Sequence, residues 1–213
     1  MWENEPELFC RPTQFFASVV DCSCLMSLAE SVAKTCGYLP NTSWLTEEES
    51  FADVAIGWHE EGVKLEIEVK QPLQRCVYPQ IGQGDAVELF CDTRDLKTAS
   101  LPSRFCHHFF FLPEPVEEVQ RGELSRFRGE DRHPLATEED LLCDVHRFPK
   151  SYRMTLLLPS KVLFGYDPNQ FQRLGFAYRI HRFQGKPQHF TLCSPDFSLP
   201  QQPALWATLL LVK

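Results

Sequence analysis

The sequence lacks the features that mark nucleic-acid-binding and membrane proteins. It has no long run of basic residues, and 29 acidic against 21 basic residues give a net charge of −8. Such a chain is poorly suited to phosphate backbones and anionic lipid surfaces. The segment 1–6 is acidic and contains no apolar run, so it predicts neither a secretory signal peptide nor a membrane anchor. We therefore expect no nucleic-acid partner and no membrane partner, and we attribute the charge to solubility.

Local signatures of catalysis are also absent. The sequence has no GxSxG, no HExxH and no EF-hand pattern, and Gly82 and Gly84 lack the helix-opening context of a phosphate-binding loop. Glu88 and Asp92 share a predicted strand face and could act as paired carboxylates on a glycoside. Any sheet with a charged solvent face would carry the same residues, however. We therefore expect no enzymatic activity and no obligatory cofactor.

The cysteines do not form a disulfide framework. Their number, nine, is odd, and the chain is not short. Cys91 and Cys106 fall inside predicted strands, as small core residues do. Cys22 and Cys24 are separated by one residue, which is too close for a zinc knuckle. The pattern predicts reduced thiols and a cytoplasmic location; export through a signal of another kind would leave no trace in these residues.

The composition favours a β-rich core. Phenylalanine occurs 17 times and methionine only three times, and 43% of the 213 residues are hydrophobic. Residues 63–69 alternate cleanly, with apolar side chains on one face and charged ones on the other, which is typical of a half-buried antiparallel strand. Further strands are predicted at 15–20, 51–58, 84–92, 105–112, 152–158, 174–183, 188–192 and 205–212. Residues 25–36 have the spacing of a short amphipathic helix, although a strand would also fit.

These patterns predict an all-β fold, an antiparallel β-sandwich of jelly-roll type with about eight to ten strands. We expect residues 1–213 to form a single domain with an irregular lead-in at 1–14. Residues 113–147 are polar and aperiodic, which predicts one long loop. Loops of that length are usually functional or mobile, so a protein partner could dock there.

Three segments carry a family resemblance: 51–69, the strand-and-turn stretch 84–95, and 174–179 together with 205–209. Over about residues 45–213 the chain resembles the DOMON-like superfamily and its relative, carbohydrate-binding module family 9. The resemblance implies a jelly-roll sandwich that binds sugars, or haem in some members, usually without catalysis. The chain departs from the sugar-binding pattern because no pair of stacking tryptophans can be placed on facing loops. Segments 104–109 and 187–190 are similar to a less characterised subgroup.

The candidate site begins where one predicted strand ends in Asp92, Arg94 and Asp95 and the next begins at Arg104. Arginine offers a planar fork of donors for carboxylates, phosphates or vicinal hydroxyls, so these residues could line a polar pocket. They could equally form an internal salt-bridge knot. Trp58, at a strand end, could stack on a sugar or pack in the core. The predicted ligand-binding residues are Asp92, Arg94, Asp95, Arg104, His107, His108, Arg179, His181, Arg182, His189 and Trp58.

Metal binding stays open as an alternative. His107 and His108 are adjacent on a strand and so point to opposite faces. A metal or haem site could be assembled from one of them with His133 and His189. Loop carboxylates could bind calcium instead; the candidates are Asp53, Asp85, Asp92, Asp95 and Asp167. Our leading hypothesis is a non-enzymatic sandwich that binds a carbohydrate or a similar polyhydroxylated or anionic small polar ligand, and the oligomeric state is left open.

Overall fold

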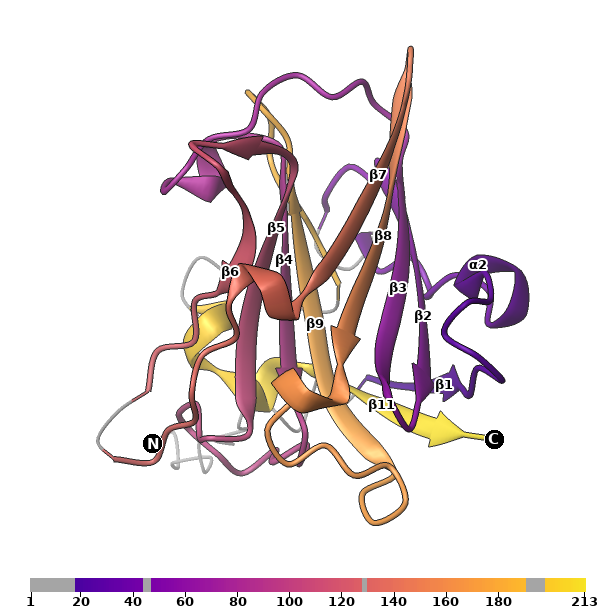
Figure 1. Cartoon of the computed structure of the whole chain (residues 1–213), viewed down its shortest axis with the longest axis vertical. Helices are drawn as coiled ribbons and strands as arrows, with labels where there is room; N and C mark the ends of the chain where they lie inside the picture. The colour runs from indigo at the N-terminus through magenta and orange to yellow at the C-terminus, as the bar shows by residue number, and fades with distance from the viewer. Residues whose placement is uncertain (1–17, 44–46, 128–129, 191–197) are drawn as a thin grey trace, which may run out of the picture.

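The computed structural model describes residues 18–43, 47–127, 130–190 and 198–213. In these ranges two β-sheets pack face to face (Figure 1). The strands are β1 (Val19–Ser23), β2 (Ala52–His59), β3 (Gly62–Val69), β4 (Ala86–Asp92), β5 (Cys106–Val116), β6 (Val119–Glu123), β7 (Leu142–Phe148), β8 (Ser151–Pro159), β9 (Arg173–His181), β10 (Gln188–His189) and β11 (Ala207–Val212). The predicted all-β sandwich is confirmed, with eleven described strands. The lead-in 1–14 and the start of the predicted first strand lie outside the described residues.

The larger sheet places β4 at its centre. Its order is β1-β11-β9-β4-β5-β6, with β10 also paired to β9, and the smaller sheet has the order β2-β3-β8-β7. The strand pairs are antiparallel apart from β1 with β11, which run parallel. Every residue of β4 is buried, because strands flank it on both sides and chain segments cover both of its faces. A charged residue in β4 must therefore find its partners on neighbouring strands.

The apolar face of the alternating strand 63–69 is buried as predicted, whereas Lys64 on the face expected to be solvated is buried as well. Val63, Leu65 and Ile67 are at most 2% exposed and face the interior. Val87 and Leu89 of β4 lie in the same hydrophobic cluster, as their spacing predicts. Alternation that buries one face of each strand fixes the register, because a shift by one residue would exchange the two faces.

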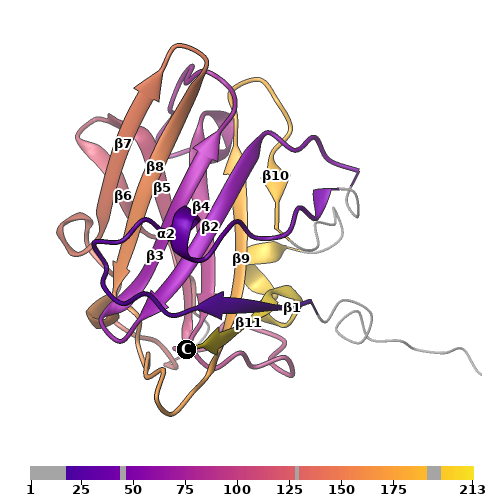
Figure 2. The ribbon, with the colours of Figure 1, turned by 90° about the vertical axis from the view of Figure 1, so that its right-hand side faces the viewer.

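A short helix, α2 (Val32–Thr35), covers the outer face of the smaller sheet (Figure 2). The helix expected over 25–36 is therefore reduced to one turn. Glu66 of β3 accepts hydrogen bonds from the backbone N–H groups of Val32 and Ala33, at 3.1 Å each, and from the Ser31 hydroxyl at 2.9 Å. A carboxylate at a helix N-terminus satisfies otherwise unpaired donors. Glu66, which the alternation assigns to a solvated face, thus anchors the helix to the sheet.

The long loop predicted at 113–147 is wrong in extent. β5 continues to Val116 and turns directly into β6, and β7 begins at Leu142. The turn residues Glu117 and Glu118 both have positive φ, 51° and 67°. β6 and β7 are edge strands, which keep polar residues on their exposed sides. The charged residues of these two strands therefore hide the alternating pattern in the sequence. A deletion of this range would remove strands, so it is not a neutral test for a docking loop.

Gly62 illustrates how tightly the β2–β3 connection fits. Its φ is +149°, and a Cβ atom built there would lie 2.3 Å from the backbone oxygen of Leu158 on β8. We expect Gly62→Ala to lower the free energy of unfolding by at least about 2 kcal/mol, because strained backbone and a backbone clash combine. Urea denaturation would measure it. Gly37→Ala is the matched control: Gly37 also has positive φ (+76°) but open space around it. Equal losses in the two variants would contradict the steric argument.

No helix among the described residues is both long enough and apolar enough to cross a membrane.

Candidate functional site

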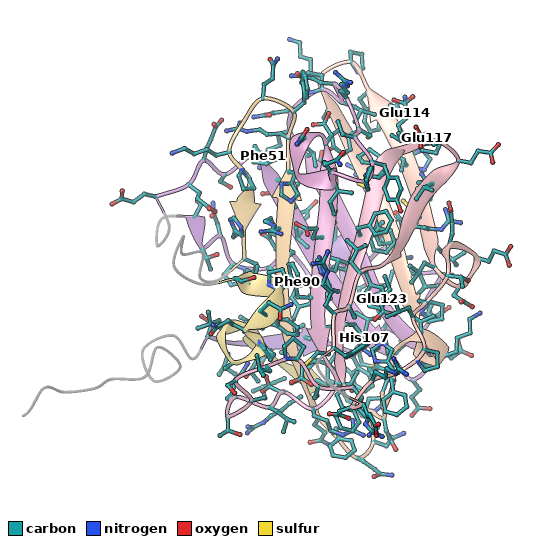
Figure 3. All side chains as sticks on the ribbon, turned by 90° about the vertical axis from the view of Figure 1, so that its left-hand side faces the viewer. Phe51, Phe90, His107, Glu114, Glu117 and Glu123 are labelled. Atoms are coloured by element: carbon teal, nitrogen blue, oxygen red, sulfur yellow. The ribbon has the colours of Figure 1, made fainter. Side chains whose placement is uncertain are left out.

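Four of the candidates, His108, Arg179, His181 and His189, share one face of the larger sheet with Glu88 and Phe90. In the β4–β9 ladder Glu88 pairs with Arg179 and Phe90 with Ala177, and in the β4–β5 ladder Phe90 pairs with His108. Directly opposed residues point to the same face of a sheet. His189 of β10 pairs with Arg179 and so joins this face. Figure 3 shows the face with Phe90 near its middle.

Glu88 is the hub of a buried polar cluster. Its Oε1 lies 2.9 Å from His108 Nε2, and its Oε2 lies 2.6 Å from His181 Nε2 and accepts a hydrogen bond from Arg179 Nε. Burial alone would raise the pKa of Glu88, but the hydrogen bonds from His108, His181 and Arg179 outweigh it and hold that pKa well below its usual value. Glu88 is 3% exposed, so its negative charge is fixed inside the protein and neutralised by these partners.

An aromatic layer lies beside the cluster. Phe90 packs against the His108 ring at a centroid distance of 4.4 Å and against Trp206 at 5.8 Å. Trp206 Nε1 donates a hydrogen bond to the Leu199 carbonyl at 2.9 Å. Phe90 and Trp206 are 0% and 2% exposed, so the short helical turns before β11 cover most of this layer.

A cavity of about 640 Å³ opens where this cover stops. The start of β5, the segment after β6 and the segment before β11 form its walls. The lining residues are Pro79, Pro102, Cys106, His107, His108, Leu124, Ser125, Arg126, Phe127, Ser198, Pro200, Gln201 and Trp206. Arg126 is exposed, and none of these described lining residues is acidic. The cavity has the mixed apolar and polar lining of small-molecule sites, and its volume falls in their usual range.

A second polar cluster lies next to this cavity, around Glu123 at the end of β6. Glu123 Oε1 lies 2.9 Å from His107 Nδ1, 2.8 Å from His133 Nε2 and 2.7 Å from the Ser125 hydroxyl. Burial alone would raise the pKa of Glu123, but the two histidines outweigh it and lower that pKa to about 2. Figure 3 places Glu123 and His107 together beside β6.

The turn that follows β4 is a closed knot. Asp92 accepts hydrogen bonds from the backbone N–H groups of Arg94 (2.9 Å) and Leu96 (2.8 Å). Asp95 pairs with Lys97 at 2.6 Å and accepts a hydrogen bond from Thr208 at 2.7 Å. Both aspartates are therefore bonded inside the protein, as in a knot that fixes the turn, but their partners are backbone N–H groups, Lys97 and Thr208 instead of the predicted arginines.

The arginines predicted for the site are dispersed. Arg94 lies over the Phe171 ring, 3.6 Å from its centroid. Arg104 pairs with the exposed Asp131, and Arg182 pairs with Glu49 at 2.7 Å. None of the three lines the cavity. Their donors are therefore directed to protein groups away from it.

Trp58 does not present a ring to solvent. It is 1% exposed, and its Nε1 donates to the carbonyl of Val212 at 3.1 Å, so its predicted role in ligand stacking is wrong and core packing is correct. His189 is buried beside Glu48, 2.7 Å from Nδ1 to Oε1. Of the predicted site residues, only His107 and His108 line the cavity. Arg179 and His181 do not line it, but both bond to Glu88, which in turn bonds to His108.

Three of the carboxylates considered for calcium, Asp53, Asp85 and Asp167, bond to separate parts of the chain, and Asp92 and Asp95 lie in the knot after β4. Asp53 pairs with Lys70 at 2.7 Å, and Asp85 accepts the backbone N–H groups of Gln74 and Arg75. Asp167 caps the turn that follows it. In the described ranges, the cluster of metal-ligating groups is His107, Glu123 and His133 instead. The prediction brought His107 and His133 together correctly, but it missed Glu123 and included His189.

The described cysteines are free thiols, in agreement with the reduced state expected; Cys10 and Cys193 lie outside the described residues. Cys106 borders the cavity, but burial raises the pKa of its thiol to about 12. A thiol with that pKa stays protonated and is a poor nucleophile near neutral pH.

No family model matches the sequence, and no curated protein matches it. Solved structures do share its fold. A family 9 carbohydrate-binding module from Caldicellulosiruptor kristjanssonii in complex with glucose matches with a TM-score of 0.62 at 12% identity, covering 92% of this chain and 96% of that one. The module in complex with cellotriose matches at 0.61 and 13%, covering 91% and 93%. A candidate carbohydrate-binding protein from Bacteroides uniformis matches at 0.56 and 11%, covering 91% and 98%. The predicted similarity in fold to family 9 carbohydrate-binding modules is therefore confirmed.

Proposed function

We propose that this protein is a non-enzymatic module that binds a carbohydrate in the cavity over the start of β5. The observation that carries the proposal is the cavity itself, about 640 Å³ in volume, with aromatic and proline surfaces beside polar side chains. Saccharides need both kinds of surface, because their C–H faces pack on apolar groups while their hydroxyls require hydrogen-bond partners. The shared fold with glucose-bound and cellotriose-bound modules supports the same ligand class.

The side chains in the walls have complementary roles. Phe127 and Trp206 supply apolar surface. Arg126 and Gln201 carry hydrogen-bond donors in the cavity walls. Neither side chain forms a hydrogen bond to another described residue. His108 is held rigid by Glu88, so its position does not have to be ordered when a ligand binds. A mono- or disaccharide with hydroxyl or acidic groups toward Arg126 fits this lining.

Catalysis is not part of the proposal. Glycoside hydrolysis requires two carboxyl groups across the bond that breaks. Among the described residues, Glu88 and Glu123 are the carboxylates next to the cavity, and each is buried and bonded to its own histidines. Groups that are occupied in this way support the walls and are not placed to protonate a leaving group.

Arg126→Gln should weaken saccharide binding about tenfold or more, because a hydrogen bond to a charged group contributes about 1.5–3 kcal/mol. A glycan array would identify ligands, and isothermal titration would measure Kd for the wild type and the variant. Arg173→Gln is the control, since Arg173 is also exposed but lies on β9 away from the cavity. If no saccharide on the array binds with a Kd below about 1 mM, the carbohydrate proposal is overturned. Equal binding by the two variants would show that Arg126 does not contact the ligand.

A further inference from the structure

The cluster of His107, Glu123 and His133 has the geometry of a metal site. One nitrogen from each histidine and one carboxylate oxygen lie within 4.8 Å of one another. The two nitrogens approach the same oxygen, Glu123 Oε1, at 2.9 Å and 2.8 Å. The three residues come from β5, from β6 and from the segment after β6. A single ion between them would therefore join three parts of the chain.

The tautomer of His133 requires a cation in the cluster. His133 Nδ1 lies 2.6 Å from the backbone carbonyl of Arg104, and because a carbonyl only accepts, Nδ1 carries a proton. In the neutral ring Nε2 then has a lone pair, and it points at Glu123 Oε1, which also carries lone pairs. Two acceptors at 2.8 Å repel each other unless a positive particle lies with them. That particle is either a proton shared between Nε2 and Oε1 or a metal ion.

The surroundings favour the metal ion. The side chains of His107, Glu123 and His133 are at most 1% exposed. Phe109 stacks on His107 at 5.4 Å, and Phe127 meets the His133 ring edge-on at 4.7 Å. An apolar shell around converging nitrogen and oxygen ligands is the usual setting of a protein-bound metal.

The outer contacts of His133 and Glu123 also match a metal site. Ligating histidines commonly donate their second N–H to a backbone carbonyl, as His133 does to Arg104. The second oxygen of Glu123 accepts the backbone N–H of Ala136 at 2.8 Å, which orients the carboxylate. Two imidazoles and one carboxylate are ligands that zinc accepts with tetrahedral geometry.

We propose that His107, Glu123 and His133 bind one zinc ion that fixes the wall of the cavity. Ser125 connects the two sites, because its hydroxyl donates to Glu123 at 2.7 Å and accepts the backbone N–H of His108 at 2.8 Å. Ser125, Arg126 and Phe127 line the cavity directly after Glu123. The ion would lie beneath the cavity wall, and the proposal does not depend on which ligand the cavity takes.

The first test measures metal in the full chain, purified without a histidine tag. Elemental analysis should find about one zinc per chain. After chelation and dialysis, added Co²⁺ should give the visible absorption bands of a tetrahedral nitrogen and oxygen site. Zinc should raise Tm of the dialysed protein, and protease cleavage between 124 and 137 should slow. Absence of stoichiometric zinc together with absence of Co²⁺ bands would overturn the proposal.

Variants locate the site. His133→Gln should lose zinc and the Co²⁺ spectrum, whereas His146→Gln should keep both, because the side chain of His146 is 67% exposed and lies on β7 outside the cluster. If His133→Gln does not fold, nitrogen-15 spectra of the wild-type imidazoles replace it. A metal-bound Nε2 supports the site, and a doubly protonated His133 in zinc-loaded buffer contradicts it.

Discussion

Glu88→Gln is expected to lower the free energy of unfolding by about 3–5 kcal/mol, the usual cost of breaking a buried ion pair by removing one partner. Arg179 would lose its carboxylate, and the glutamine NH₂ would face donors from His108 or His181. Glu88 lies at the centre of the larger sheet and is 3% exposed, so water has little access to the bonds that it would lose. Urea denaturation followed by tryptophan fluorescence measures the loss.

A surface pair provides the control for this variant. Glu68 pairs with Arg153 at 3.3 Å, with side chains 33% and 47% exposed. Glu68→Gln removes the same charge and should cost less than about 1 kcal/mol, because solvent screens exposed pairs. If Glu88→Gln costs no more than Glu68→Gln, the cluster does not stabilise the fold.

The same carboxylate makes stability depend on acid. In the folded protein, burial raises the pKa of Glu88, but the hydrogen bonds from its three partners outweigh burial and hold the pKa well below its ordinary value of 4.5. The folded state therefore binds fewer protons than the unfolded state, so the stabilisation is complete above about pH 4.5 and falls as the pH drops below it. Glu123, with its pKa lowered to about 2, contributes in the same direction. Glu88→Gln should reduce the loss of unfolding free energy per pH unit below pH 4.5, and the loss that remains should be the contribution of Glu123.

Trp58→Ala should cost about 3–5 kcal/mol, as truncation of a large buried aromatic side chain usually does. The ring is 1% exposed within the core, and its N–H reaches the carbonyl of Val212. Its backbone carbonyl also accepts the N–H of Leu25 at 2.8 Å. Trp58 therefore links the smaller sheet to β11. Thermal or urea unfolding gives the magnitude.

Trp58→Phe separates packing from hydrogen bonding, because it keeps an aromatic ring and loses the N–H bond, and it should cost less than the alanine variant. Saccharide affinity of the folded fraction should stay unchanged in both, since Trp58 is not part of the cavity. A loss of affinity without a loss of stability would instead restore the sequence-based interpretation of Trp58 as a stacking residue.

The fold could be predicted further than the site. Alternation in 63–69 and in 86–92 specifies which face is buried, and that information is local. The edge strands β6 and β7 escaped prediction because exposed charges mask their periodicity. Glu88 is visible only as a charge on a strand face, and its burial depends on residues about ninety positions away, such as Arg179 and His181.

The same limit applies to the histidine clusters. His107 and His108 are adjacent on β5, so their side chains point to opposite faces of the sheet, as the strand geometry predicts. Their partners, Glu123 and Glu88, come from the two strands that flank β5. No spacing along the chain encodes which strands are neighbours in a sheet, so only the assembled topology identifies the pairs.

The parallel pairing of β1 with β11 has a consequence for the order of assembly. Val19 pairs with Thr208, so nearly the whole described chain separates these partners. Closing so long a loop is entropically slow, and proteins rich in distant contacts fold in milliseconds to seconds. On the ribosome β1 emerges long before its partner strand β11. We therefore expect nascent chains to need protection of β1 until synthesis reaches β11, and chains shortened before β11 to aggregate.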